Sequence, residues 1–171
     1  MKITDHELAA QLATETGIRL ISLREQLFNE GASPWYVMDA GDAIAHRFLI
    51  DSLNHYRPND AVLSEEGADN SLRLSADRVW IIDPLDGSNE YGETGRADWA
   101  VHVALWQRTN VPEGELTAGA VALPAYDMTL STANPPPTPV RHDGNPRLVV
   151  SRNRTSREAV VVAQALGCDV A

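Results

Sequence analysis

The stretch RVWIIDPLDGSNEY, residues 78–91, decides the fold and the chemistry that we expect of this chain. Four apolar residues, 79–82, precede Asp-Pro, a pattern typical of a short buried strand that ends abruptly. Asp83 and Asp86 follow at the tip of this strand. Two carboxylates at one strand tip favour a bound divalent cation, because hard cations take oxygen ligands from carboxylates and backbone carbonyls.

Pro84 restricts the backbone around these acids. It locks its own φ and pushes Asp83 toward an extended conformation, so that Asp83, the Leu85 carbonyl and Asp86 can converge on one ion. The following glycine permits a tight turn, after which residues 88–91 can begin a helical turn whose free N–H groups bind phosphate. The alternative is an ordinary polar turn, because Asp, Pro and Gly dominate turns.

The composition is that of an acidic globular protein. The chain has 171 residues, of which 43% are hydrophobic and 22% charged, and its formal net charge is −10. Such a charge argues against binding a nucleic-acid polymer, but it permits a small anionic ligand if metal ions invert the local field. No apolar run reaches membrane-spanning length, and the single Cys168 fits a reducing compartment. We therefore expect a cytoplasmic protein with no membrane partner.

Two helices are expected in the first third of the chain. A Thr-x-x-Glu capping box begins at Thr4, and leucines on one face predict a helix over about residues 4–28. Residues 29–34 resemble a loop, and a second helix is expected over 39–56. Asp42 would then lie in the first turn, where the helix dipole favours a carboxylate.

A second predicted strand also ends in acids. Residues 61–63 form a short apolar run, which is followed by Ser64, Glu65, Glu66 and Gly67. Further strands are expected after the central one, joined by short turns in an antiparallel meander: 98–106, 115–123 and 128–132. Acidic residues that follow two separate strands are less easily explained as ordinary turn residues than acidic residues that follow one strand. The single histidines His46 and His102 have no metal-ligand spacing, so we expect them at the surface or in the core.

A Pro-rich segment predicts a domain boundary. We expect three parts: a metal-binding N-terminal α+β domain over 1–134, a linker over 135–146, and the first βα unit of an incomplete C-terminal α/β domain over 147–171. In the last part, a second capping box at Thr155 begins a helix that Gly167 ends.

Taken together, these features resemble a known family. Asp42, then Glu65-Glu66, then Asp83-Pro-Leu-Asp86-Gly-Ser88 stand in the order found in the lithium-sensitive, magnesium-dependent phosphomonoesterases of the inositol monophosphatase superfamily. The family signature adds a late Trp-Asp, so three of its four parts are present. The resemblance implies a layered α/β sandwich of the sugar-phosphatase type, α+β in class. Its N-terminal helices would pack on a largely antiparallel sheet, with the start of a second α/β domain beyond.

The resemblance assigns metal ligands. Glu65, Asp83 and the Leu85 carbonyl resemble ligands of a first Mg²⁺ ion, and Asp83 with Asp86 resembles ligands of a second. The implied cofactors are two or three Mg²⁺ ions, with Li⁺ as an inhibitor. Residues 33–42 are shorter than the family's corresponding stretch and lack its Lys, which leaves the third ion open.

Substrate and catalytic roles follow from the same match. Asp86, Gly87 and Ser88 resemble the residues that bind the substrate phosphate, the last two through backbone amides. Asp42 and the Ser88 hydroxyl resemble the pair that orients and activates the attacking water. Glu65 counts among the catalytic residues as well.

Glu90 indicates the substrate branch. An acid here, followed by the aromatic Tyr91, is similar to the 3′(2′),5′-bisphosphate nucleotidases. The expected substrate is therefore 3′-phosphoadenosine 5′-phosphate, which yields AMP and phosphate in sulfate assimilation. Inositol 1-phosphate and fructose 1,6-bisphosphate are further candidates, and Glu90 as a simple helix-start acid stays open.

Two other functions stay open. The chain ends before the late Trp-Asp, whose Asp completes the second metal site in the family. The first alternative is therefore that the chain is a catalytically impaired metal-binding module. Such a module would self-associate through an exposed domain edge, as a homodimer for example. A structural Ca²⁺ protein is the third alternative.

Overall fold

The computed structural model describes residues 3–67, 71–138, 140, 144–150 and 156–170. It contains long helices and a mainly antiparallel sheet, which confirms the α+β class. Contacts divide the chain into two compact units, Met1–Pro136 and Pro137–Ala171.

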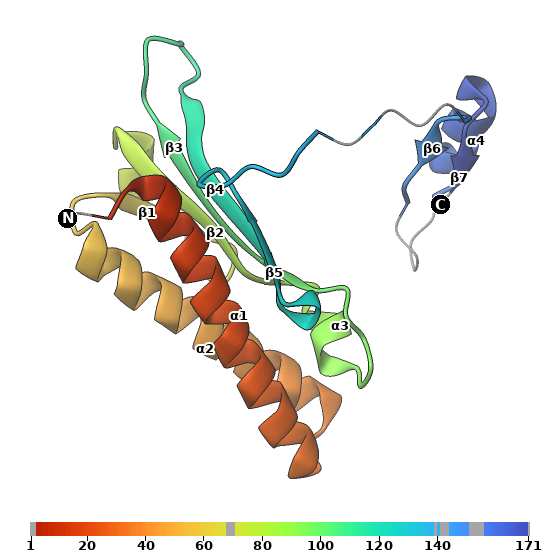
Figure 1. Cartoon of the computed structure of the whole chain (residues 1–171), viewed down its shortest axis with the longest axis horizontal. Coiled ribbons are helices and arrows are strands. Elements are labelled where there is room, and N and C mark those ends of the chain that lie inside the picture. The colour runs from red at the N-terminus through yellow and green to blue at the C-terminus, as the bar shows by residue number, and fades with distance from the viewer. Residues whose placement is uncertain (1–2, 68–70, 139, 141–143, 151–155, 171) are drawn as a thin grey trace. The chain divides into compact units, whose positions relative to one another are not determined.

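A five-stranded sheet forms one layer of the first unit (Figure 1). Its strands lie in sequence order: β1 (Ala61–Ser64), β2 (Arg78–Asp86), β3 (Ala100–Gln107), β4 (Glu115–Leu123) and β5 (Met128–Ser131). The pairs from β2 to β5 are antiparallel, which confirms the predicted meander, whereas β1 pairs with β2 in parallel. Because parallel strands point the same way, the carboxyl ends of β1 and β2 meet at one edge of the sheet.

Two long helices, α1 (Asp5–Asn29) and α2 (Pro34–Tyr56), pack on one face of this sheet (Figure 1). The Thr4 side chain accepts a hydrogen bond from the Glu7 amide, so the predicted capping box of α1 is confirmed. The predicted start of α2 was wrong. Ser33 caps this helix and proline takes its first position, where a missing N–H does no harm. Asp42 therefore lies in the third turn, and the helix-dipole argument does not apply to it.

The core lies between the helices and the sheet. Side chains at alternate positions of β2 and β3 are buried against the helices, as expected for a sheet with one covered face: Trp80, Ile82, Val101, Val103 and Leu105. The Tyr91 and Trp99 rings meet edge to face at 5.0 Å beside them. The Tyr91 hydroxyl donates to the Leu20 carbonyl at 2.8 Å and ties the region after β2 to α1.

Strand β2 does not end at Asp-Pro, contrary to the sequence prediction. It continues to Asp86, and its register with β3 shifts between Asp83 and Asp86. Pro84 has no N–H to donate, and prolines within sheets are confined to edges, strand starts and bulges. The irregular register accommodates Pro84, so the two acids belong to the end of the strand instead of the turn after it.

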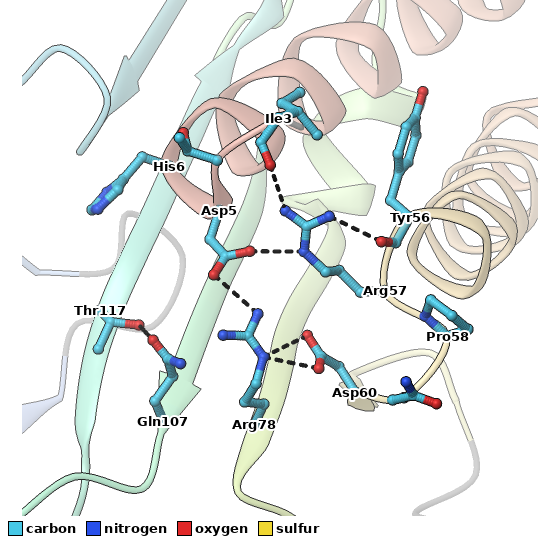
Figure 2. Close-up of a pocket in the computed structure, with 12 residues that line it drawn as sticks. Ile3, Asp5, His6, Tyr56, Arg57, Pro58, Asp60, Arg78, Gln107 and Thr117 are labelled. Carbon is cyan, nitrogen blue, oxygen red and sulfur yellow. Dashed lines mark hydrogen bonds and ion pairs between the residues drawn. The ribbon is translucent and has the colours of Figure 1, made fainter. Parts of the chain in front are cut away.

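An ion-pair network occupies the opposite end of β2 (Figure 2). There Asp5 accepts hydrogen bonds from Arg57 at 2.8 Å and from Arg78 at 3.0 Å, and Arg78 also binds Asp60 at 2.9 Å. These groups line a cavity of about 610 Å³. Each of the four charges has an opposite partner, so the network joins α1, β2 and the turn before β1.

The second unit contains a short helix between two short strands. β6 (Arg147–Leu148) and β7 (Asp169–Val170) pair in parallel, and α4 (Arg157–Leu166) connects them. Ser156 caps α4, whereas the predicted cap Thr155 lies outside the described residues. Gly167 ends the helix with a φ of 62°, as predicted.

The remaining helical segments are short: η1 (Ser71–Leu74), α3 (Ser88–Gly92) and η2 (Pro124–Tyr126). Among the helices that the structure describes, none is long and apolar enough to cross a membrane.

Candidate metal and phosphate site

The parallel strands β1 and β2 bring their acids to one place. The Glu65 amide donates to the Ile82 carbonyl at 3.2 Å, which extends the pairing past the end of β1 and holds Glu65 beside Asp83. Glu65, Asp83 and Asp86 line one cavity of about 520 Å³, together with His102 from β3. The three carboxylates that the sequence predicted as metal ligands therefore share one cavity.

Asp83 and Glu65 are in direct contact. Burial, the hydrogen bond with the Glu65 side chain and the charges of Glu65 and Asp86 raise the pKa of Asp83 to about 7, against the opposing effect of the Leu85 amide. Two carboxylates in contact cannot both ionise cheaply, so the pair favours a proton or a cation between them. A divalent cation would neutralise this local excess of negative charge.

The donor chemistry fits Mg²⁺ held by few protein ligands. Within residues 3–67, 71–138, 140, 144–150 and 156–170, no three His, Cys, Asp or Glu side chains form a ready metal cage. The set predicted for one ion differs from such a cage, because it combines Glu65 and Asp83 with the Leu85 backbone carbonyl. Mg²⁺ usually keeps several waters and takes one or two carboxylates. The Glu65–Asp83 pair matches that requirement.

Helix α2 presents Asp42 to the end of β2. The Ser88 hydroxyl donates to Asp42 Oδ1 at 3.0 Å and lies 3.0 Å from the Leu85 carbonyl oxygen. Burial raises the pKa of Asp42 to about 6; the charges of nearby acids add to this effect, and the hydrogen bond from Ser88 opposes it. The structure thus brings together the two side chains that the sequence paired for water activation.

Gly87 makes the turn between β2 and α3. Its φ is 85°, in the left-handed region, and a Cβ atom here would lie 2.9 Å from the Asp98 carbonyl oxygen. Both facts exclude a larger residue. Helix α3 begins directly afterwards, which confirms the predicted helical turn, and no described side chain caps it. Its first amides, including that of Ser88, have no partner within the helix.

Sequence reasoning missed two histidines at this site. His102 is paired with Asp83 across the β2–β3 ladder, and its Nε2 lies 3.2 Å from Asp86 Oδ2. His46 Nδ1 lies 2.9 Å from Ser64 Oγ at the end of β1. Their spacing is not that of metal ligands, and only tertiary structure shows where they lie: the β2–β3 pairing for His102 and the packing of α2 for His46. The one available signal was the position of His46, four residues after a predicted site residue on the same helix.

Glu90 lies in a cluster around Arg96. The Arg96 guanidinium contacts Glu90, Glu93 and Asp98 at 3.3, 3.2 and 2.6 Å. Arg24 of α1 joins the same loop by donating to the backbone carbonyls of Glu90 and Glu93. Glu90 therefore helps to hold the segment after α3, and its predicted part in substrate selectivity stays a prediction.

Comparison with known proteins identifies the family of this chain. The model of the inositol monophosphatase family matches residues 7–167. A 3′-phosphoadenosine 5′-phosphate phosphatase from Mycobacterium leprae is 53% identical over 129 residues, which are 72% of this chain and 46% of the relative. A protein of the same name from Mycobacterium tuberculosis is 46% identical over 148 residues, 82% of this chain and 53% of the relative. The chain thus spans about half the length of these relatives.

Solved structures show the same fold. Inositol monophosphatase-II from Staphylococcus aureus MSSA476 superposes with a TM-score of 0.73 at 22% identity, over 93% of this chain and 62% of that one. Mycobacterium tuberculosis SuhB superposes with a TM-score of 0.57 at 26% identity, over 74% and 43%. The family match extends over the carboxylates and the Gly87 turn and continues into the second unit as far as residue 167, and the chain is a member of the inositol monophosphatase family.

Proposed function

We propose that this chain carries the catalytic site of a Mg²⁺-dependent phosphomonoesterase that hydrolyses 3′-phosphoadenosine 5′-phosphate to AMP and phosphate. One observation carries the proposal: Glu65 and Asp83 touch at the tips of two parallel strands, in one cavity with Asp86. Two carboxylates in contact attract a divalent cation, and the bound cation in turn attracts the phosphate group of an ester. The relatives named for this substrate support the choice of ester.

A first ion would be held by Glu65, Asp83 and the Leu85 carbonyl, and a second ion by Asp83 and Asp86. When bound, Mg²⁺ supplies neutralisation of phosphate charge and a lowered pKa for a coordinated water. The carboxylates must be ionised to act as ligands, so binding displaces the proton that Asp83 otherwise favours.

Asp42 and Ser88 act on the attacking water. The hydrogen bond between them, 3.0 Å long, orients the Ser88 hydroxyl toward Asp42, so that a water next to Ser88 can pass a proton along this bond. The pKa of Asp42, raised to about 6 by burial, leaves the side chain ionised near pH 7 and basic enough to accept that proton.

The phosphate would lie against the turn after β2. The backbone amides of Gly87 and Ser88 would donate to its oxygens, and Asp86 would complete the phosphate site. Glu90 next to this turn is the proposed selectivity residue for the nucleoside part, and inositol 1-phosphate and fructose 1,6-bisphosphate are the competing substrates. We propose that the protein acts in the cytoplasm, in sulfate assimilation, with small phosphorylated molecules as its ligands.

A second candidate is a metal-binding module with impaired turnover. Its basis is that Glu65 and Asp83 are in contact and can hold one ion, whereas the described residues group no three ligating side chains around a single ion. In that case the Glu65–Asp83 pair binds an ion without efficient hydrolysis.

Phosphate release separates the two candidates. The 171-residue chain is incubated with 3′-phosphoadenosine 5′-phosphate, Mg²⁺ and either Li⁺ or no addition, with inositol 1-phosphate in parallel. We expect release that requires Mg²⁺, falls with Li⁺ and is fastest for the nucleotide. Absence of release despite Mg²⁺ binding would support the impaired module. Stabilisation by Ca²⁺ alone, without Mg²⁺ binding or hydrolysis, would indicate a structural calcium site.

A further inference from the structure

We infer that His46 is a positioning residue of the acidic site: it holds the tip of β1 through Ser64 and thereby fixes the direction of Glu65. The inference rests on the proposed function, because Glu65 is the residue that this function assigns to a metal ion. His46 itself contacts neither the proposed ion nor the substrate.

One side of α2 reaches both strand tips. His46 lies four residues after Asp42, so the two side chains project from the same side of the helix. Asp42 accepts a hydrogen bond from Ser88 after β2, and His46 Nδ1 lies 2.9 Å from the Ser64 hydroxyl at the end of β1. The helix therefore connects the two segments that supply the acidic side chains.

The contact between His46 and Ser64 is enclosed. Ser64 is only 9% exposed, and a buried hydroxyl without a hydrogen-bond partner is costly. The Gly67 amide donates to the Ser64 carbonyl at 3.3 Å, which closes the turn that contains Glu65. A Cβ atom on Gly67 would lie 3.3 Å from His46 Cε1, so this turn packs directly on the imidazole.

These contacts bear on the Glu65 carboxylate. Glu65 is exposed and only its end contacts the Asp83 side chain, so this long side chain can turn away from Asp83 unless the backbone that carries it is fixed. The Ile82 carbonyl holds the Glu65 amide on one side, and the His46–Ser64 contact holds the preceding residue on the other. Partners that orient metal ligands typically contribute about 10–100-fold to affinity.

Mg²⁺ binding measured by isothermal titration calorimetry tests the inference on the 171-residue chain. His46→Ala and Ser64→Ala should each weaken Mg²⁺ binding about tenfold. His46→Asn should restore most of the affinity, because its amide can take the place of Nδ1. The double variant should be no weaker than either single variant, since both remove the same contact. His55→Ala, exposed on the same helix, is the matched control and should bind as the wild type does.

Circular dichroism establishes which variants are folded. Unchanged Mg²⁺ affinity in folded His46→Ala, or additive losses in the double variant, would overturn the inference. If His46→Ala does not fold, Ser64→Ala decides: unchanged affinity overturns the inference, and a tenfold loss supports it. A wild-type chain that binds no Mg²⁺ would instead overturn the proposed function and this inference with it. That result is obtained on the wild type alone, so the two failures are distinguishable.

Discussion

Removal of one negative charge from the acidic site should stabilise the metal-free protein and abolish its response to Mg²⁺. Glu65 is exposed and contacts the half-buried Asp83. Glu65→Gln keeps the size and hydrogen-bonding capacity of this side chain but removes its charge. Repulsion from Asp83 then disappears, and so does one proposed metal ligand.

The magnitude follows from this contact. Two unit charges about 4 Å apart repel by about 4 kcal/mol at an effective dielectric constant of about 20. Solvent and salt screen the exposed Glu65, which reduces the expected gain to about 1–2 kcal/mol. For a chain of this size, that gain raises Tm by about 3–6 °C.

The gain should depend on pH. Burial and the contact with Glu65 raise the pKa of Asp83 from 3.8 to about 7. Because folding raises the pKa of Asp83, ionisation of this carboxyl lowers the free energy of unfolding. This loss of stability is absent at pH values below the pKa of Asp83 in the unfolded chain, grows with pH, and is complete above about pH 7. The advantage of Glu65→Gln should therefore be full at pH 8 and small at pH 5.

Thermal unfolding in EDTA and in Mg²⁺ provides the assay. At a Mg²⁺ concentration a hundred times the Kd, binding should add about 2.7 kcal/mol to the stability of the wild type, and almost nothing to Glu65→Gln. Glu115→Gln, an exposed acid at the start of β4, controls for the loss of charge in general. A lower Tm for metal-free Glu65→Gln at pH 8, or a full Mg²⁺ response, would refute the reasoning.

Three further changes test other parts of the molecule. Asp86→Asn should keep stability within about 0.5 kcal/mol because Asp86 is 61% exposed, yet it should lower kcat/KM at least about a hundredfold; Asp51→Asn, exposed on α2, is its control. Ser88→Ala should lower kcat about 10²-fold, and Ser88→Thr should retain activity, as measured by phosphate release. Asp5→Asn should lower the free energy of unfolding by about 1–2 kcal/mol at pH 7 in urea titrations. Burial alone would raise the pKa of Asp5, but hydrogen bonds and charges from two arginines lower it below 3.8. The Asp5 contribution is thus present above pH 3.8 and lost as the pH falls through the folded pKa, so the variant and the wild type should converge in acid.

The acids of the site were predictable because short local sequence patterns identify them. Asp-Pro-x-Asp-Gly after an apolar run places Asp83 and Asp86 at a strand end without knowledge of any neighbour. Gly87 follows from the same pattern, since only a residue that tolerates positive φ suits this turn. The predicted strand over 115–123 likewise agrees with β4, whose buried residues alternate along its length.

The wrong predictions, the start of α2 and the end of β2, both concern a proline that is compatible with two different local structures. Pro34 is typical of loops but also of the first position of a helix, and Ser33 before it decides in favour of the helix. Pro84 usually ends a strand, yet β2 passes it because the register with β3 shifts at that point. The start of α2 was therefore readable from the neighbouring residue, whereas the passage of β2 through Pro84 depends on strand pairing, which local patterns do not contain.

The parallel pairing of β1 and β2 is the feature on which the site depends and which no local pattern predicts. Had the two strands run antiparallel, Glu65 and Asp83 would lie at opposite ends of the pair, because each directly follows the last residue through which its strand pairs with the other, Ser64 in β1 and Ile82 in β2. The parallel register instead sets Ser64 beside Ile82, and the next residue of each strand is an acid. A chain gains no stability from two unneutralised carboxylates in contact, so this arrangement runs against local energetic preference. Conflicts of this kind are expected at functional sites, where a ligand of opposite charge removes the penalty.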